Sequence, residues 1–136
     1  MKFFCLAALF LFLSSVGFCQ GGRIFKSKFS KKEAYIFDEK YPHVLIIPAE
    51  ANRFTPNESE IEIVEATIND SIPLKKYYRQ YVGYYKNGDK ILLVNLLRRK
   101  EKNYSLSEFL LGFGPYYERN QRIIYINISK NSYSNP

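Results

Sequence analysis

Residues 77–90, YYRQYVGYYKNGDK, decide the fold because they place a tight turn at the end of a strand-like run. The pair Asn87-Gly88 is the strongest short signal for a type I′ turn, in which both central residues take positive φ. Counting outward from this turn pairs Lys86 with Asp89 and fixes the partner of every residue further along both strands. The sequence therefore predicts an antiparallel β-hairpin with a defined register.

Both faces of this predicted hairpin are largely apolar. Two sets of alternating residues on its first strand define them: Tyr77, Arg79, Tyr81, Gly83 and Tyr85 on one face, and Tyr78, Gln80, Val82 and Tyr84 on the other. A hairpin with one solvated face would instead alternate apolar with polar residues. We therefore expect the hairpin to lie centrally, with a layer of the protein on each side.

Residues 53–73, RFTPNESEIEIVEATINDSIP, contain the best helix start in the chain. We expect Thr55 as the N-cap, Pro56 as the first helical residue and Glu58 as the acidic member of a capping box. A strand is the competing interpretation, because β-branched residues are frequent in this segment. The capping pattern favours the helix, whose apolar residues then share one face: Ile61, Val64 and Ile68.

Four further strands are expected from apolar or alternating runs, at residues 34–37, 43–47, 106–113 and 122–129. In the last run, Ile124, Ile126 and Ile128 share one face, and Ile123, Tyr125 and Asn127 share the other. Together with the hairpin and the helix, these runs predict an α+β fold. We expect one helix packed on an antiparallel sheet of four to six strands, in an arrangement similar to that of cystatins.

The chain begins with a segment typical of a secretory signal peptide. Lys2 precedes an apolar run at residues 3–13, which is shorter than the ~20 residues that a membrane span needs. Cleavage is expected after Cys19, with a cut after Gly17 as the alternative. We therefore expect a secreted or periplasmic protein with no transmembrane segment after signal cleavage.

The expected organisation is a signal peptide, a basic flexible arm, a single α+β domain and a disordered tail, at residues 1–19, 20–32, 33–130 and 131–136. Both cysteines, Cys5 and Cys19, lie in the signal peptide, so the domain must be stabilised by its core without disulfides. The whole chain has a formal net charge of +7. The arm is expected to be a mobile, solvated end, with attachment to an anionic cell surface as the alternative.

Few side chains beyond the signal peptide suit catalysis or metal binding. The chain has one histidine, His43, which excludes any site that needs two histidines. We expect no catalytic residue, no metal site and no cofactor. A small hydrolase that uses Glu58, Glu62 and His43 is the alternative, because paired carboxylates carry out glycoside hydrolysis.

Tyr77, Arg79, Tyr81 and Tyr85 form the candidate binding face on one side of the hairpin. Tyrosine and arginine are enriched in protein interfaces, so the expected partner is a protein or a cell-envelope component, and no nucleic acid is expected. Arg79 has a second interpretation as a buried residue paired with a carboxylate such as Glu65. The sequence favours a non-enzymatic binding module over the hydrolase or a self-associating structural protein of the envelope.

The hairpin carries the motif Y-x-R-Q-Y-x-G, followed by an N-G turn and a strand that ends in asparagine. Its residues here are Tyr77, Arg79, Gln80, Tyr81, Gly83, Asn87, Gly88 and Asn95. Together with the preceding FTP, this motif resembles a group of small secreted proteins of unknown function from Bacteroidota-type bacteria. The resemblance ends after residue 98, where this chain has GFGPYY in place of a tryptophan and a D-G-G turn. It implies export and a compact α+β domain, and it carries no activity with it.

Overall fold

One mixed β-sheet forms the framework of the protein. The structure is a computed structural model that describes residues 21–42, 44–99 and 103–134. Its strands are β1 (Gly22–Phe25), β2 (Ala34–Phe37), β3 (Arg53–Phe54), β4 (Tyr78–Lys86), β5 (Asp89–Leu97), β6 (Gln121–Asn127) and β7 (Ser132–Ser134). Its helices are α1 (Glu58–Asn69), the short 3-10 helix η1 (Leu74–Lys76) and α2 (Pro115–Asn120). The strands lie in the order β1-β2-β4-β5-β6-β7, and β3 pairs with β4.

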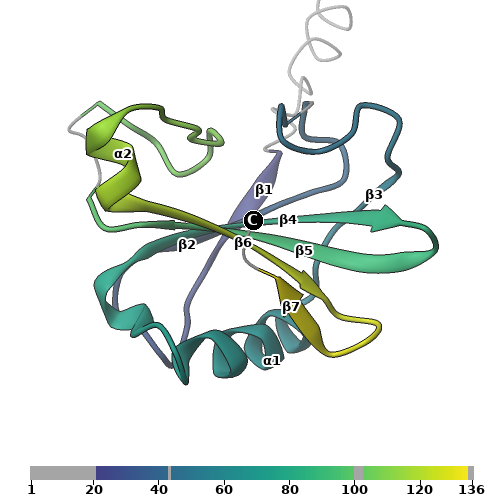
Figure 1. Cartoon of the computed structure of the whole chain (residues 1–136), viewed down its shortest axis with the longest axis horizontal. Helices are drawn as coiled ribbons and strands as arrows, with labels where there is room; N and C mark the ends of the chain where they lie inside the picture. Colours follow the sequence, from purple (N-terminus) through teal and green to yellow (C-terminus); the bar gives the residue numbers. More distant parts are fainter. Residues whose placement is uncertain (1–20, 43, 100–102, 135–136) are drawn as a thin grey trace, which may run out of the picture.

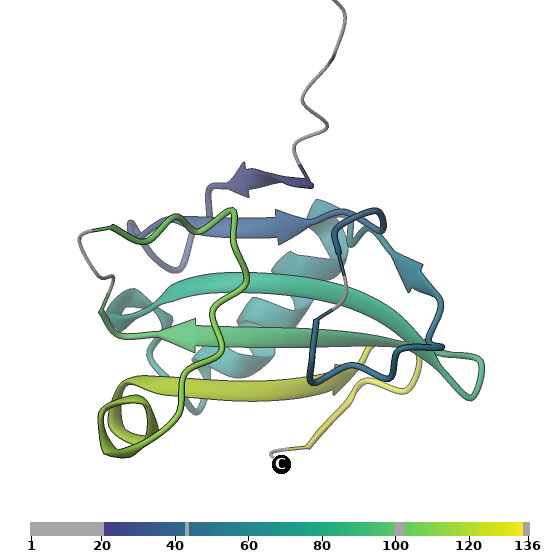
Figure 2. The same ribbon diagram turned by 90° about the horizontal axis from the view of Figure 1, so that it is seen from above.

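The sheet lies between one helix and a layer of loops. α1 crosses one face of the sheet, and irregular segments cover the opposite face (Figures 1 and 2). The predicted α+β class with one main helix is therefore confirmed.

The central hairpin has the predicted register. β4 and β5 pair antiparallel from Tyr78 opposite Leu97 to Lys86 opposite Asp89. At the turn, Asn87 has φ 52° and Gly88 has φ 82°. Positive φ at both positions is what a type I′ turn requires, so the turn residues set the register as predicted.

The helix starts two residues later than predicted. Its N-cap is Asn57, whose side chain accepts a hydrogen bond from Glu60 N at 2.9 Å, while the Glu60 carboxylate accepts one from Asn57 N at 3.0 Å. The capping box is thus of the predicted type, but it is centred on Asn57 instead of Thr55. Asparagine caps as well as threonine does, and the Thr55 hydroxyl instead accepts a hydrogen bond from Glu39 N.

Each face of the sheet has its own apolar core. On the helix side, the predicted apolar face of α1 packs against β2, β4, β5 and β6, through Ile61, Val64, Ile68, Ile36, Tyr81, Leu92, Val94, Ile124 and Ile126. The loop side contains the alternate residues of the same strands with apolar loop residues, among them Phe37, Val44, Ile47, Val82, Leu93, Leu97 and Leu106. The hairpin is therefore covered on both faces, as its composition predicts.

Two edges of the sheet differ from the prediction. β1 lies within the segment expected to be a flexible arm; it pairs with β2, and Phe25 is buried. At the opposite edge, β7 extends into the expected disordered tail and pairs with β6. The sheet is also not fully antiparallel, because β2 runs parallel to β4 with Ala34 opposite Arg79.

Two predicted strands, 43–47 and 106–113, are irregular segments in the structure, although His43 itself lies outside the described residues. Val44 and Ile47 are buried, yet Ile47 N bonds to Val44 O within a turn instead of to a neighbouring strand. Pro48 follows, and it has no N–H for a sheet ladder. These apolar runs mark the cover of the loop-side core.

Residues 1–20 lie outside the described part, and the predicted signal peptide and its cleavage site lie there. Across the residues that the structure describes, no helix combines the length and the apolar character needed to cross a membrane.

Candidate functional site

The predicted binding face is mostly inside the protein. Tyr77 is 2% exposed, and Arg79 and Tyr81 are fully buried beneath α1. Tyr85 alone of the four reaches the surface, with 38% exposure. The four residues therefore do not form an exposed binding surface, which corrects the expectation from composition.

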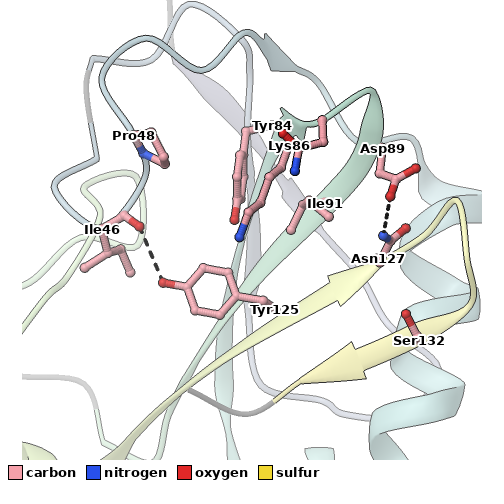
Figure 3. A pocket seen from close by; sticks show the side chains of 10 residues that line it. Ile46, Pro48, Tyr84, Lys86, Asp89, Ile91, Tyr125, Asn127 and Ser132 are labelled. Atoms are coloured by element: carbon pink, nitrogen blue, oxygen red, sulfur yellow. Dashed lines mark hydrogen bonds between the residues drawn. The ribbon is translucent and has the colours of Figure 1, made fainter.

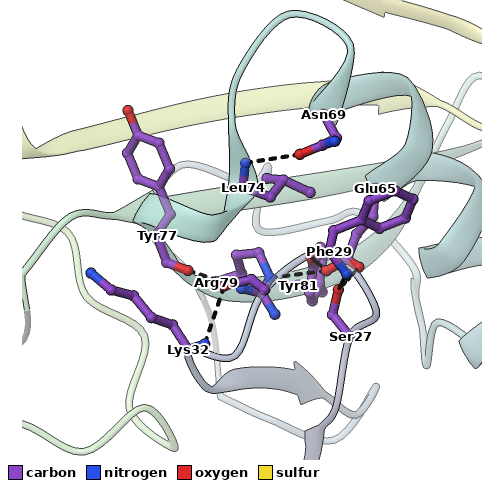
Figure 4. A network of polar contacts seen from close by, with 10 residues as sticks. Ser27, Phe29, Lys32, Glu65, Asn69, Leu74, Tyr77, Arg79 and Tyr81 are labelled. Carbon is purple, nitrogen blue, oxygen red and sulfur yellow. Dashed lines mark hydrogen bonds and ion pairs between the residues drawn. The ribbon is translucent and has the colours of Figure 1, made fainter.

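Arg79 belongs to a buried polar network centred on Glu65 of α1 (Figure 4). Arg79 Nε donates to Glu65 Oε1 at 2.9 Å, and the Tyr81 hydroxyl donates to the same oxygen. Ser27 Oγ donates to the other carboxylate oxygen. The network joins three segments, namely the connection after β1, α1 and β4. The second interpretation of Arg79, as a buried partner of Glu65, is the one that the structure confirms.

The Tyr81 hydroxyl of this network keeps its proton at neutral pH. Burial raises the pKa of Tyr81 well above its usual value, and the negative charge of Glu65 raises it further. Arg79 also donates from Nη1 to Tyr77 O at 2.9 Å, while its Nη2 has no partner among the described residues. Both oxygens of the Glu65 carboxylate accept hydrogen bonds. The network therefore acts as a structural link between the helix and the sheet.

The opposite face of the hairpin holds a second network, made of amides. Gln80 Nε2 lies 3.0 Å from Leu106 O and 2.7 Å from Glu108 O. Asn95 Nδ2 lies 2.7 Å from Leu110 O and 2.8 Å from Gln80 Oε1. These side chains bind the backbone carbonyls of a segment that has no strand partner. The motif residues Arg79, Gln80, Tyr81 and Asn95 thus secure the layers on the two faces of the hairpin.

An open cleft of about 630 Å³ lies where the loop cover ends, near the Asn87-Gly88 turn (Figure 3). It is lined by residues from the loop after β2, from β4 and β5, and from β6 and β7: Ile46, Pro48, Tyr84, Lys86, Asn87, Asp89, Ile91, Tyr125, Asn127 and Ser132. Five segments therefore contribute to one concave surface, which is the usual setting of a ligand site.

Of the two charged residues that line the cleft, Asp89 has partners for its charge and Lys86 has no ion pair among the described residues. Asp89 accepts a hydrogen bond from Asn127 Nδ2 at 2.9 Å and pairs with Lys130 Nζ at 2.9 Å. The pKa of Asp89 is lowered, chiefly by the hydrogen bond from Lys130 and next by the hydrogen bond from Asn127. Lys86, which lies opposite Asp89 in the hairpin, is exposed and has no ion pair with any residue in the described ranges. Lys86 is thus an available cation at the cleft.

Two tyrosines add hydroxyl groups beside this cation. Burial raises the pKa of Tyr125. Burial is also the larger cause of the raised pKa of Tyr84, and the nearby Tyr125 side chain is the smaller cause. Both hydroxyls therefore stay protonated at neutral pH. Tyr125 Oη donates to Ile46 O over a long 3.4 Å. The Tyr84 and Lys86 side chains run side by side toward Tyr125 (Figure 3). The cleft can therefore offer a positive charge and phenolic hydrogen bonds to one ligand.

The carboxylates of the alternative hydrolase do not meet in this cleft. Glu58 lies at the start of α1, where it pairs with Arg23 across 3.8 Å at the surface. Glu62 is exposed on α1, and neither residue lines the cleft. Within the described ranges, no group of three or more histidine, cysteine, aspartate or glutamate side chains is placed to hold a metal ion.

The cleft residues were missed by the sequence prediction. The signal that could have found them is the period of two on the second hairpin face, where Tyr84 is followed by Lys86. On β6 the same period puts Asn127 beside Tyr125. This polar continuation of an apolar face marks the point where the core ends and solvent begins.

Comparisons with known proteins assign no family. Neither the family models, nor the curated proteins, nor the solved structures contain a match to the chain. The function is therefore inferred from the geometry and chemistry of the site.

Proposed function

We propose that the protein is an exported, non-enzymatic binding module that holds an anionic, hydroxyl-bearing component of the cell envelope in the cleft. The observation that carries this proposal is Lys86, an exposed cation without an ion pair among the described residues, beside the protonated hydroxyls of Tyr84 and Tyr125. Export is inferred from the signal-peptide pattern of residues 1–19.

The chemistry of the cleft favours a small polar ligand with a negative charge. The Lys86 ammonium group provides three donors on a flexible stem and binds as a point charge. Hydrogen bonds to charged groups contribute ~1.5–3 kcal/mol, more than those between neutral groups. Asn127 and Ser132 add polar groups to the same wall. A carboxylated sugar matches this combination of one charge and several hydroxyl groups.

The resemblance of the hairpin motif to small secreted proteins fits this proposal through the structural role of the motif. Arg79, Gln80, Tyr81 and Asn95 are all fully buried. We therefore expect the motif to mark a common scaffold, with the ligand site formed by residues outside it.

The probe for the cleft is glucuronic acid, titrated into ¹⁵N-labelled protein that begins at Gln20. Every described contact lies within this protein. We expect saturable amide shifts at Lys86, Asn127 and Ser132, and much smaller shifts with glucose, which lacks the carboxylate. Lys86→Ala should weaken binding about tenfold, in line with the loss of a charged hydrogen bond.

The matched control is Lys40→Ala, because Lys40 is also exposed and does not line the cleft. Its affinity should equal that of the unmodified protein. Equal shifts with glucose and glucuronic acid, or equal loss in the two lysine variants, would overturn the proposed anionic ligand.

A further inference from the structure

Basic residues gather at the end of the sheet opposite the cleft. Lys32 Nζ donates to Lys76 O at 3.0 Å and to Arg98 O at 3.1 Å, and Arg98 N donates to Asn120 O at 2.8 Å. These bonds bring together the connection between β1 and β2, η1, the end of β5 and α2. All four segments lie at one end of the sheet, away from the turn that joins β4 and β5 (Figure 2).

We name this surface the basic end. It comprises Lys31, Lys32, Lys75, Lys76, Arg98, Arg99, Arg119 and Arg122, of which all but Lys32 are exposed. Within the described part of the chain, the acidic residues in or beside these segments are Glu33, Asp70 and Glu118, so basic side chains outnumber them. The topology therefore gathers much of the positive charge of the chain at one end of the sheet.

Several of these cations are held by neutral groups. Lys32 Nζ bonds to the two carbonyl oxygens named above and lies 4.9 Å from the centre of the Tyr78 ring. Arg119 Nε donates to Pro115 O at 3.1 Å. Such bonds orient the cations without neutralising them, so they add to the positive potential of the surface.

Two exposed aromatic side chains accompany the basic end. Phe113 is 80% exposed and Tyr116 is 39% exposed. Both precede Arg119 by a few residues, next to or within the short helix α2 (Figure 1). Aromatic side chains are enriched at the interface between water and bilayer, and basic residues are attracted to anionic headgroups.

We propose that the basic end docks the protein on an anionic lipid bilayer, with Phe113 and Tyr116 inserted among the headgroups. The breadth of the surface favours a bilayer over a small anion, since its exposed cations come from five segments: the connection between β1 and β2, η1, the residues after β5, α2 and β6. This orientation places the cleft at the opposite end, turned away from the lipid. The inference goes beyond the proposed function and does not depend on the ligand of the cleft.

The test is co-sedimentation of the protein that begins at Gln20 with lipid vesicles. The vesicles contain either phosphatidylcholine alone or phosphatidylcholine with about a third phosphatidylglycerol. We expect binding to rise at least about tenfold with the anionic lipid and to fall again at about 1 M salt, where charges are screened within a few ångströms.

Matched lysine variants locate the contact. Lys76→Glu lies in the basic end and should reduce vesicle binding about fivefold, while Lys40→Glu should stay within about twofold of the unmodified protein. Both lysines are exposed, and neither side chain has a hydrogen bond to another residue within the described ranges. Equal losses in the two variants would overturn the proposed orientation. Circular dichroism of each variant confirms that it is folded.

The aromatic residues distinguish a bilayer from a soluble polyanion. Phe113→Ser/Tyr116→Ser should lower binding to anionic vesicles and leave binding to polyglutamate unchanged. If this variant binds vesicles as well as the unmodified protein does, or if no binding to anionic vesicles is observed, the proposal is wrong.

Discussion

The two faces of the central hairpin are secured by different chemistry. On the helix side, one buried ion pair between Arg79 and Glu65 connects β4 to α1. On the loop side, the neutral amides of Gln80 and Asn95 bind backbone carbonyls of residues 106–110. Arg79 and Gln80 are adjacent in the chain, so the alternation of a single strand serves both layers.

The two faces use different polar residues because the segments that cover them have different backbone structures. A helix satisfies most of its own N–H and C=O groups, so the hairpin needs to contact only its side chains. An irregular segment leaves carbonyl groups without partners, and buried carbonyls need hydrogen-bond donors. Amides supply these donors without bringing a charge into the core. The type of cover thus determines which polar residue the strand must carry on that face.

The largest effect is expected from breaking the ion pair. Arg79→Ala leaves the Glu65 charge buried without its cation and should lower the free energy of unfolding by ~3–5 kcal/mol. Urea unfolding followed by circular dichroism measures this change. Glu62→Ala, on the exposed side of α1, is the control and should stay within ~0.5 kcal/mol. A loss below ~1 kcal/mol for Arg79→Ala would contradict the buried position.

A smaller and more local effect is expected on the loop side. Asn95→Ala leaves Leu110 O and Gln121 Nε2 each without one of its partners, which should cost ~1–3 kcal/mol. Hydrogen exchange should accelerate in residues 103–114 and stay unchanged in α1. Asn103→Ala, at an exposed position, is the control. Equal acceleration in both layers would mean that the two faces are not independently secured.

Alkaline pH should lower the free energy of unfolding through tyrosines on both faces of the sheet. Burial raises the pKa of Tyr81 on the helix side, and of Tyr84 and Tyr125 on the loop side. Above the usual value of 10.0, the unfolded chain loses these protons first, so stability present at lower pH is lost as the pH rises. Between its unfolded and its folded pKa, each such tyrosine contributes a slope of at most about 1.4 kcal/mol per pH unit.

Unfolding in urea between pH 8 and pH 11.5, and tyrosine absorbance in the same range, measure this effect. Tyr81→Phe should reduce the slope by about the share of one tyrosine. Ionisation of every tyrosine near pH 10 in the folded protein would contradict the burial on both faces.

The smallest effect is expected at the start of the helix layer. Asn57→Ala removes the N-cap and should cost ~1 kcal/mol. Thr55→Ala should stay within ~0.5 kcal/mol, because its hydroxyl bonds only to an exposed loop. Thermal unfolding of the two variants ranks them. A larger loss of stability for Thr55→Ala than for Asn57→Ala would indicate that the helix starts at Thr55, as the sequence predicts.

Local chemistry explains what could be predicted from the sequence. The Asn87-Gly88 turn fixed the hairpin register because its conformation depends on two adjacent residues. The apolar period placed Ile61, Val64 and Ile68 on the buried face of α1. The cap was misplaced by two residues because Thr55 and Asn57 are both preferred N-caps with a glutamate three residues later, and the Thr55 hydroxyl accepts a hydrogen bond from Glu39 N instead.

Contacts between distant segments explain what could not be predicted. β1 forms because β2 offers a free edge, and nothing local in GRIF marks a strand. Residues 106–113 look like a strand, but side chains of β4 and β5 bind their carbonyls instead. The candidate cleft depends on where the cover of the sheet ends, which is a property of the assembled layers.

Arg79 secures α1 from inside the protein, and its burial leaves it no part in an exposed binding surface. A double-mutant cycle with Arg79→Ala, Glu65→Ala and the double variant measures the energy of this pair directly. We predict an interaction energy of about 2–3 kcal/mol, because each single variant leaves one buried partner behind. An interaction energy below ~0.5 kcal/mol would mean that the residues act independently, and it would contradict a stabilising contact between them inside the protein.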